Sequence, residues 1–457
     1  MARPTKIVLT SLGLLILAVI FALWIRQTIV SRRLQELVAE AGLTWPPRYR
    51  TTVTFDEHNA ATLYSQAFEL IESTPGLWTG DKADEQPQES RDEAAAYESF
   101  LEKFENNETD NLAPELDTLR PWLARNEDGI ALLLEAAQID RCRFPYDFVY
   151  DLPDHEAQMR KAARVLQLAA LISAADGNAP RAAELSWALL RVGNHLQEDT
   201  VVLSNLVRCS IFSMSFATLI DASSIAPVPD HWRKRIDDEL LRYSDLDSWA
   251  DLRKEKLFFL QGIQLFLTGP VDLPDDEATA TSVLAEIPQP NPIIRGAAGV
   301  WLKPNMVKGL ELLAEFEDIC RQPYWQVQPR LADWTAAVSN LTGFYSLAGL
   351  TLGGMEGYPE QVARAQARAF TARLGLALAA YKQQTGSYPD DLAALTPDFI
   401  EEIPLDPFTG KPFIYRTEGE GFVLYSIGPN LTDDDGIYLR DKRNQVQKDD
   451  ISWRMPR

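Results

Sequence analysis

Carboxylate side chains gather near the C-terminus in a pattern that could bind a hard cation. The stretch after Gly428 reads PNLTDDDGIYLRDKRNQVQKDDISW. Ca²⁺ takes roughly six to eight oxygen ligands, often several carboxylates together with carbonyls and water. If the stretch folds back on itself, such oxygens are available from Asn430, Asp433, Asp434, Asp435 and Asp450. The alternative is an exposed turn over 433–436, because Asp and Gly are common in turns.

The histidines and cysteines form no motif of a metal enzyme. No HExxH is present, and the four histidines are widely spaced at His58, His155, His195 and His231. His195 stands close enough to Glu198 and Asp199 to bring two metal ligands together, and an exposed or capping histidine is the alternative. No CxxC pair occurs among the cysteines Cys142, Cys209 and Cys320. We expect isolated buried thiols, with one disulfide as the alternative.

Motifs of other common enzyme classes are also missing from the sequence. The chain has no GxSxG elbow, no phosphate-binding loop and no GxGxxG. The glycine-rich stretch 349–357 follows an apolar helical pattern rather than a strand, and the Tyr358-Pro359 pair after it indicates a break between domains. A catalytic serine with its acid and base could only be brought together by the fold, without any sequence motif that reveals them. The sequence therefore favours a non-enzymatic protein.

The charge balance argues against one class of partner. The 457 residues include 66 Asp and Glu against 44 Lys and Arg, which gives a formal net charge of −22. Binding to nucleic acid needs a cationic surface, so nucleic acid is not an expected partner. With 46% hydrophobic and 24% charged residues the composition is that of a globular protein, and the length favours two domains with appendages.

An apolar stretch near the N-terminus predicts a membrane anchor. The stretch begins at Ile7, ends at Ile25 and contains no charged residue, and roughly 20 apolar residues cross a bilayer as a helix. It is longer than the apolar part of a signal peptide, and no small-residue cleavage site follows it. We therefore expect a tail over 1–6, an uncleaved anchor over 7–29 and a juxtamembrane linker over 30–50. Because basic residues occur on both sides of the apolar stretch, the positive-inside rule barely distinguishes the two orientations of the anchor.

Residues 51–357 are expected to form a helical domain, because apolar residues recur three and four positions apart between Pro and Gly breaks. A first helix is expected from Asp56 to Ile71, followed by a charged loop over 75–92. Tryptophans spread along the domain predict core packing, with a ligand cage as the alternative.

The clearest helical hairpin of this domain runs from Glu156 to Gly193, with its turn over 176–178. Its length and small residues resemble a single tetratricopeptide-like unit, and no second copy is recognisable. The longest loop is predicted over 269–292, where five prolines and an acidic run occur.

Residues 358–457 predict an α+β domain. A helix that starts at Pro359 is expected to end in a left-handed cap at Gly386, and Asp390 is expected to cap a short helix after it. Two strands and the turn that joins them follow at 413–415, 422–425 and 418–421, respectively. The fold class expected for the whole chain is therefore mainly α with a C-terminal α+β domain.

The order of these elements is distinctive. Residues 376–428 read LALAAYKQQTGSYPDDLAALTPDFIEEIPLDPFTGKPFIYRTEGEGFVLYSIG, and Asp449, Asp450, Ile451 and Trp453 follow later. This part resembles the globular domain of the major pseudopilin of type II secretion systems. The resemblance implies a helix packed on a small antiparallel sheet, followed by a calcium-binding loop.

The resemblance further implies that Asp450 is a ligand of a structural Ca²⁺. Lys448 stands where the family usually has an aspartate, and Asp449 could compensate by moving into place. The expected metal site comprises Asn430, Asp433, Asp434, Asp435, Asp449 and Asp450. An ion there would neutralise the clustered carboxylates and hold a loop that lacks regular hydrogen bonding.

Together these features predict a bacterial protein with a single-pass anchor in the inner membrane and most of its chain outside the cytoplasm. The pseudopilin-like module favours protein–protein interaction within the cell envelope, linked to secretion or envelope assembly. The anchor lacks the Gly-Phe-Thr-Leu-x-Glu type of processing site of pseudopilins, which argues against assembly into a pseudopilus. Two alternatives stay open, a helical extracytoplasmic hydrolase and a small-ligand-binding protein, each with the C-terminal module as a docking tag.

Overall fold

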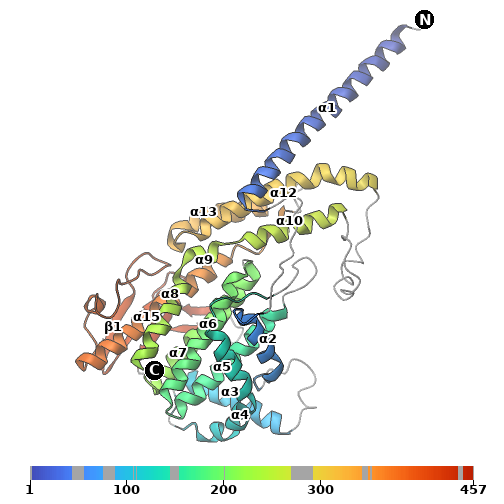
Figure 1. Ribbon diagram of the computed structural model, residues 1–457. Coiled ribbons are helices and arrows are strands. Elements are labelled where there is room, and N and C mark those ends of the chain that lie inside the picture. The colour runs from blue at the N-terminus through green and yellow to red at the C-terminus, as the bar shows by residue number, and fades with distance from the viewer. Residues whose placement is uncertain are drawn as a thin grey trace.

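The computed structural model shows a mainly helical chain with a small antiparallel sheet near the C-terminus, which confirms this coarse fold class (Figure 1). It describes residues 3–43, 56–75, 88–105, 108–109, 111–144, 154–199, 201–268, 292–341, 348–349, 352–440 and 446–455. Side chains of residues 3–18, 20, 105, 154, 261–299, 301 and 440 are outside this description.

The helices follow one another along nearly the whole chain. The α-helices are α1 Arg3–Glu40, α2 Ala60–Leu70, α3 Gln88–Glu105, α4 Ala113–Ala137, α5 Asp154–Ala175, α6 Ala179–His195, α7 Val202–Ile225, α8 Asp230–Ser244, α9 Leu246–Ala250, α10 Arg253–Thr268, α12 Pro292–Cys320, α13 Tyr324–Ser339 and α15 Tyr358–Thr385. Two short 3₁₀ helices are η2 Leu196–Glu198 and η4 Leu392–Leu395. The strands are β1 Ile414–Glu418, β2 Gly421–Ser426, β3 Tyr438–Arg440, β4 Val446–Asp449 and β5 Ile451–Met455.

The hairpin of α5 and α6 forms where the sequence predicts it. Gly177 has a φ of +76°, a left-handed conformation that glycine adopts without steric cost. Asn178 caps α6, because its side-chain oxygen accepts a hydrogen bond from the Arg181 amide at 3.2 Å. A tight turn and a capped return helix therefore place the two apolar faces against each other.

Two predictions about the neighbouring segments need correction, and a third lies almost entirely outside the described residues. Residues 88–92 were expected in a loop but open α3, where the Gln88 side chain donates to Asp92 one turn later at 2.7 Å. The first helix begins at Ala60 behind the N-cap Asn59, four residues after its predicted start. The predicted long loop over 269–292 lies outside the described residues except at Pro292, where α12 begins.

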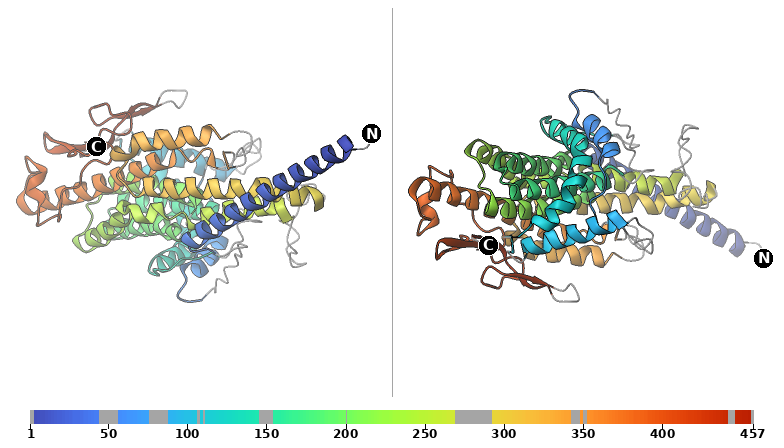
Figure 2. Two further views of the ribbon diagram at one scale, coloured as in Figure 1. Left: turned by 90° about the horizontal axis from the view of Figure 1, so that it is seen from above. Right: turned by 90° about the horizontal axis from the view of Figure 1, so that it is seen from below.

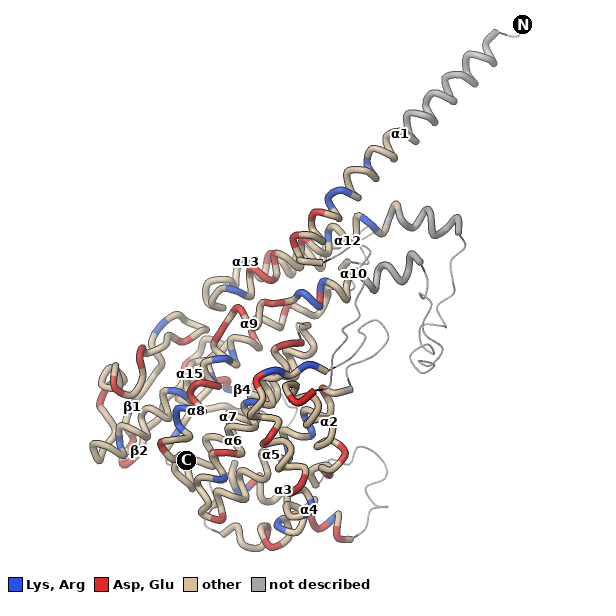
Figure 3. The backbone as a smooth tube through the Cα atoms, in the orientation of Figure 1, with Lys and Arg blue, Asp and Glu red and all other residues tan. Residues whose placement is uncertain are grey.

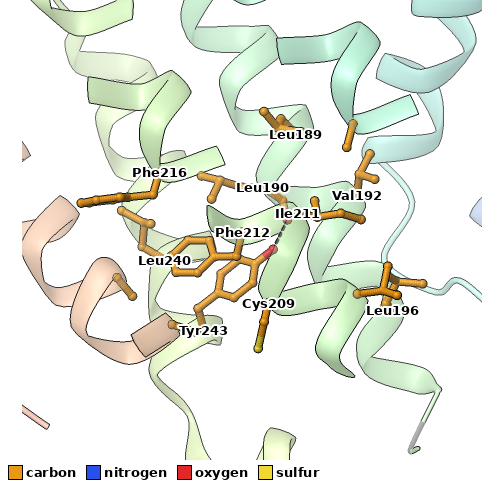
Figure 4. Packing of buried hydrophobic residues seen from close by; sticks show 14 of the residues in the cluster. Leu189, Leu190, Val192, Leu196, Cys209, Ile211, Phe212, Phe216, Leu240 and Tyr243 are labelled. Atoms are coloured by element: carbon orange, nitrogen blue, oxygen red, sulfur yellow. Dashed lines mark hydrogen bonds between the residues drawn. The ribbon is translucent and has the colours of Figure 1, made fainter. Parts of the chain in front are cut away.

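Helix α7 lies in the centre of the helical core. Among the helices whose side chains are described, it is the one that is long and apolar enough to cross a membrane, and about 67% of its most apolar window is buried. Most side chains of the predicted anchor over 7–29 lie outside this description. Figure 4 shows Phe212 of α7 stacked on Tyr243 of α8, with ring centroids 3.8 Å apart. The Tyr243 hydroxyl donates to the Leu190 carbonyl of α6 at 2.9 Å. Helix α7 is thus apolar because it packs against helices on several sides.

Most described tryptophans and all three cysteines are part of the interior. Trp122, Trp249 and Trp334 are almost fully buried, and each indole nitrogen donates to a backbone carbonyl. This burial confirms the core packing expected for most of the tryptophans, whereas the prediction was wrong for Trp325, which is 43% exposed. Cys142, Cys209 and Cys320 are free and buried, as expected for isolated thiols.

The C-terminal sheet has the order β1-β2-β5, and all its pairs are antiparallel. The turn between β1 and β2 confirms the predicted strand pair, whereas β5 and the separate β3–β4 pair were not predicted as strands. Helix α15 packs on this sheet, and a Cβ at Gly375 would overlap the Trp453 ring of β5. Gly386 ends α15 with a φ of +91°, as predicted. The cap of η4 is Asp391 rather than Asp390, because Asp391 accepts from the Ala393 amide.

Helix α15 also packs on the helical body. Its Arg373 pairs with Asp237 of α8 at 2.7 Å, and the Gln366 side chain donates to the Ser244 carbonyl at 2.8 Å. Its contacts with α7 and α8 are more extensive than those with the sheet. The predicted domain boundary at 357–358 therefore falls at the start of a helix that is shared by two cores.

Helix α1 is continuous from Arg3 to Glu40 and has two different halves. Its C-terminal turns pack on α12 and bury Leu34, Leu37 and Val38. Its N-terminal half stands away from the rest of the molecule in Figures 1 and 2. The first part of the predicted linker, residues 30–40, thus continues the helix instead of interrupting it.

Candidate functional site

The acidic stretch folds back on itself, and Asp450 holds the fold. Asp450 lies between β4 and β5, and its Oδ2 accepts hydrogen bonds from the Gly436 amide at 2.7 Å and the Asp434 amide at 3.0 Å. Gly436 has a φ of +73°, and a Cβ there would lie 2.9 Å from the Val423 side chain. The loop therefore needs both a carboxylate at 450 and a glycine at 436.

Asp434 and Asp433, on the outer side of the loop, make further hydrogen bonds within it. Asp434 Oδ2 accepts from the Asn430 side-chain amide at 2.8 Å and from the Asp449 amide at 3.0 Å, and these hydrogen bonds lower the pKa of Asp434. Asp433 Oδ1 accepts from the Tyr425 hydroxyl at 2.9 Å and from the backbone amide two residues later at 3.0 Å. Hydrogen bonds therefore connect Asn430 and Asp450 to Asp434, and Asp433 is held beside Tyr425.

The other two predicted ligands face arginines. Asp449 accepts two hydrogen bonds from the Arg364 guanidinium of α15, at 2.8 Å and 2.6 Å. Asp435 lies 2.6 Å from a guanidinium nitrogen of Arg416 on β1. A guanidinium neutralises a carboxylate as a metal ion would, so these two charges are compensated within the protein.

One buried oxygen of this loop has no hydrogen-bond partner among the described residues. Asp450 Oδ1 is buried and has no hydrogen-bond partner there. Burial, together with the charges of Asp434 and Asp433, raises the pKa of Asp450 to about 6, although the two amide hydrogen bonds oppose the shift. A cation beside Oδ1 would relieve both the burial and the repulsion.

The donor set fits Ca²⁺ in its chemistry, since it consists of carboxylate and carbonyl oxygens. Asp450, Asp434 and Asp433 are the side chains that would hold the ion, and the ion would supply positive charge to the loop. Among the described residues, however, no three His, Cys, Asp or Glu side chains already form a group that could hold a metal ion.

A buried ionic cluster around Asp199 was missed by sequence reasoning. Asp199 Oδ2 lies 2.8 Å from His155 Nε2, and Lys254 Nζ lies 2.9 Å from Asp199 Oδ1. Burial alone would raise the pKa of Asp199, but the hydrogen bond with His155 and the charge of Lys254 lower it overall. Lys254 also donates to the Glu198 carbonyl at 2.8 Å. The cluster thus ties the starts of α5 and α10 to the segment between α6 and α7.

Beside this cluster, a serine hydroxyl contacts a second buried carboxylate. Nucleophilic catalysis needs a hydroxyl beside a base that a third group orients. Ser204 of α7 donates its hydroxyl to the carboxylate of Glu156. Burial raises the pKa of Glu156, and the Ser204 hydrogen bond opposes that shift.

His195 was expected to be an exposed or capping residue, and that prediction was wrong. The side chain is buried, and its Nδ1 lies 2.8 Å from the Tyr64 hydroxyl of α2. Burial lowers the pKa of His195 to about 3. Asp199, its possible co-ligand by spacing, bonds to His155 instead. The apolar neighbours of His195 along α6 were the signal that could have indicated burial.

Comparison of the chain with protein-family models, curated proteins and solved structures finds no match. The likeness to pseudopilins therefore remains a prediction from the sequence. Function has to be inferred from the described geometry and from the chain itself.

Proposed function

We propose that this chain is a non-enzymatic protein of the bacterial envelope, held in the inner membrane by the N-terminal half of α1. The supporting observation is the exposure of the described large apolar side chains between Val19 and Ile25, at the end of the apolar stretch. Val19, Phe21, Leu23 and Trp24 are 45–62% exposed, and successive residues of a helix are rotated by about 100°. A helix that is apolar all round requires lipid or other helices around it.

Membrane extraction tests the anchor. Replacing Leu14 and Leu17 together with Asp costs roughly 5–7 kcal/mol of insertion free energy, at about 2.5–3.5 kcal/mol per charge. We expect the wild-type chain to resist carbonate extraction and the double Asp variant to be released. The same two positions changed to Ala are the control and should behave as the wild type does. Release of the wild-type chain by carbonate would refute the anchor.

The side of the membrane needs its own measurement. We propose that the body, from about residue 30 onward, lies outside the cytoplasm. Protease added to spheroplasts should then digest the body and leave a cytoplasmic marker protein intact. Digestion that requires lysis of the spheroplasts would place the body in the cytoplasm and overturn this part of the proposal.

The β3–β4 hairpin is the surface that best supports a role in protein–protein interaction. Leu431, Ile437, Leu439 and Val446 are exposed on or beside it, and such apolar groups favour contact with a partner. Residues 438–448 contain four basic residues and one acidic residue, in a chain with a net charge of −22. An envelope protein with an acidic rim around an apolar patch is therefore the proposed partner, through a module that resembles a pseudopilin.

Photo-crosslinking in cells tests this surface. A photoreactive residue at Leu439 should give one dominant adduct with a membrane or envelope protein. The same residue at the exposed position Lys411 is the control and should give none. Equal crosslinking from both positions, or adducts with abundant cytoplasmic proteins only, would argue against the proposed interface.

Binding of Ca²⁺ by the acidic loop is a second proposal, favoured by the partnerless Oδ1 of Asp450. A ligand that binds only the folded state raises the melting temperature once its concentration exceeds the dissociation constant. For an extracellular type of site we expect that rise at roughly 0.1–1 mM Ca²⁺. The full-length chain in neutral detergent should show it, and Asp450→Asn should not. No rise at about 5 mM Ca²⁺ would refute binding and leave the loop as a hydrogen-bonded turn.

A further inference from the structure

The anchor helix leaves the body beside α12. Lys303 Nζ of α12 lies 3.1 Å from Ser31 Oγ, and Arg33 Nε lies 3.4 Å from Glu311 Oε1. In both views of Figure 2, α12 and the free half of α1 extend toward the same side of the molecule. The N-terminal turns of α12 therefore approach the side from which the anchor projects.

Both helices carry only positive charge on this side. Residues 19–35 of α1 contain Arg26, Arg32 and Arg33 and no Asp or Glu. Residues 292–310 of α12 contain Arg295, Lys303 and Lys308 and again no Asp or Glu. Figure 3 shows blue segments on α1 and α12 close to where the two helices meet. In a chain with 66 acidic and 44 basic residues, this separation of charge requires an explanation.

On both helices, the first Asp or Glu after the basic stretch lies nearer the body of the protein. The first ones after these stretches are Glu36 on α1 and Glu311 on α12. Both pair with Arg33, at 3.6 Å and 3.4 Å, and so does Glu40 at 3.7 Å. The carboxylates that pair with Arg33 thus lie on the body side of Arg26, Arg32 and Lys303 along the two helices.

The distance to the bilayer is short because α1 does not break. If the apolar stretch ends at Ile25, Arg32 lies about 10 Å farther along the helix at 1.5 Å per residue. The headgroup layer adds roughly 5–8 Å to each side of the hydrocarbon core, and the Debye length is about 8 Å at physiological ionic strength. The charges of Arg32, and of Lys303 beside Ser31, are therefore within electrostatic reach of lipid phosphates.

We propose that Arg26, Arg32, Lys303 and Lys308, here called the basic collar, bind the phosphates of anionic lipid headgroups. The inference rests on the proposed membrane anchor and adds a lipid class to it. A phosphate is recognised by Lys and Arg through charge and hydrogen bonds, whereas a zwitterionic headgroup offers the same phosphate with a compensating amine. The collar would hold the body against the membrane and leave the β3–β4 hairpin for its partner.

Lipid binding to the full-length chain in neutral detergent tests the collar by native mass spectrometry. The wild-type chain should retain phosphatidylglycerol at least tenfold better than phosphatidylcholine, and about 0.5 M salt should remove the preference. A triple variant with Arg32, Lys303 and Lys308 changed to Gln should lose most of it, since each basic residue near the surface contributes roughly fivefold. Lys234→Gln, at an exposed position of α8, is the matched control and should leave it unchanged.

Two further measurements distinguish an error in the proposed collar from an error in the proposed anchor and from misfolding of the triple variant. Arg32→Glu alone leaves the Lys303 contact with Ser31 intact, so it should weaken the preference even if the triple variant folds poorly. Carbonate extraction reports on the anchor independently of the collar. A chain that resists extraction but binds both lipids equally would overturn the collar alone, and a chain released by carbonate would overturn the anchor itself.

Discussion

Replacing Asp449 by Asn distinguishes an ion pair from a metal ligand. Both carboxylate oxygens accept from Arg364, and the two side chains are only 6% and 13% exposed. Removing one partner of a buried ion pair costs roughly 3–5 kcal/mol, because the remaining charge is left buried without compensation. Arg364 keeps Glu360 at 2.9 Å, so we expect the lower end, about 3 kcal/mol.

Hydrogen exchange of the full-length chain measures this loss where it occurs. A local destabilisation of about 3 kcal/mol should speed exchange of the β4 and β5 amides by roughly a hundredfold. Arg364→Met should have a similar effect, and the double variant should lose clearly less than the sum. The acceleration should be equal with a chelator and with millimolar Ca²⁺. Strictly additive losses, or an effect seen only with Ca²⁺, would refute the ion pair.

Three other substitutions follow from single contacts. Because the pKa of His195 lies near 3 when folded, the unfolded chain takes up the proton first below about pH 6.5. This histidine should therefore lower the free energy of unfolding by about 1.4 kcal/mol per pH unit between pH 6 and 4, and His195→Gln should flatten that slope in urea unfolding. Gly375→Ala should destabilise by roughly 1–3 kcal/mol, since the methyl group meets the Trp453 ring, and an unchanged urea midpoint would contradict this packing. Asp391→Ala should cost about 1 kcal/mol by removing the η4 cap, and Asp390→Ala should cost close to nothing.

Sequence patterns predicted the elements whose ends are determined locally. The turn at Gly177 and the cap at Gly386 both need a residue with a left-handed backbone conformation. A glycine at the end of a helical pattern predicts such a position. The choice between Asp390 and Asp391 failed because either carboxylate could accept from a nearby amide. Strand β5 was missed although Ile451 and Trp453 alternate, because no turn signal separates it from β4.

The contacts that assemble the interior could not be predicted from spacing. His155 and Asp199 are 44 positions apart, and their pairing depends on how α5 and the segment after α6 meet. The same holds for Asp449 and Arg364, which are 85 positions apart. A carboxylate whose sequence position predicts a calcium ligand can thus pair with an arginine in the folded protein. Either Ca²⁺ or a guanidinium supplies the positive charge that the carboxylate requires.

Helix α15 bears on whether the C-terminal module is a separable docking tag. A tag joined by a linker would bury its own core and leave the body complete without it. Instead, one side of α15 packs on the sheet near Trp453, and another pairs Arg373 with Asp237 of the body. Removal of the module would expose the faces of α7 and α8 that α15 covers. The C-terminal sheet is therefore joined to the helical body by a helix that both cores share, which argues against a separable docking tag.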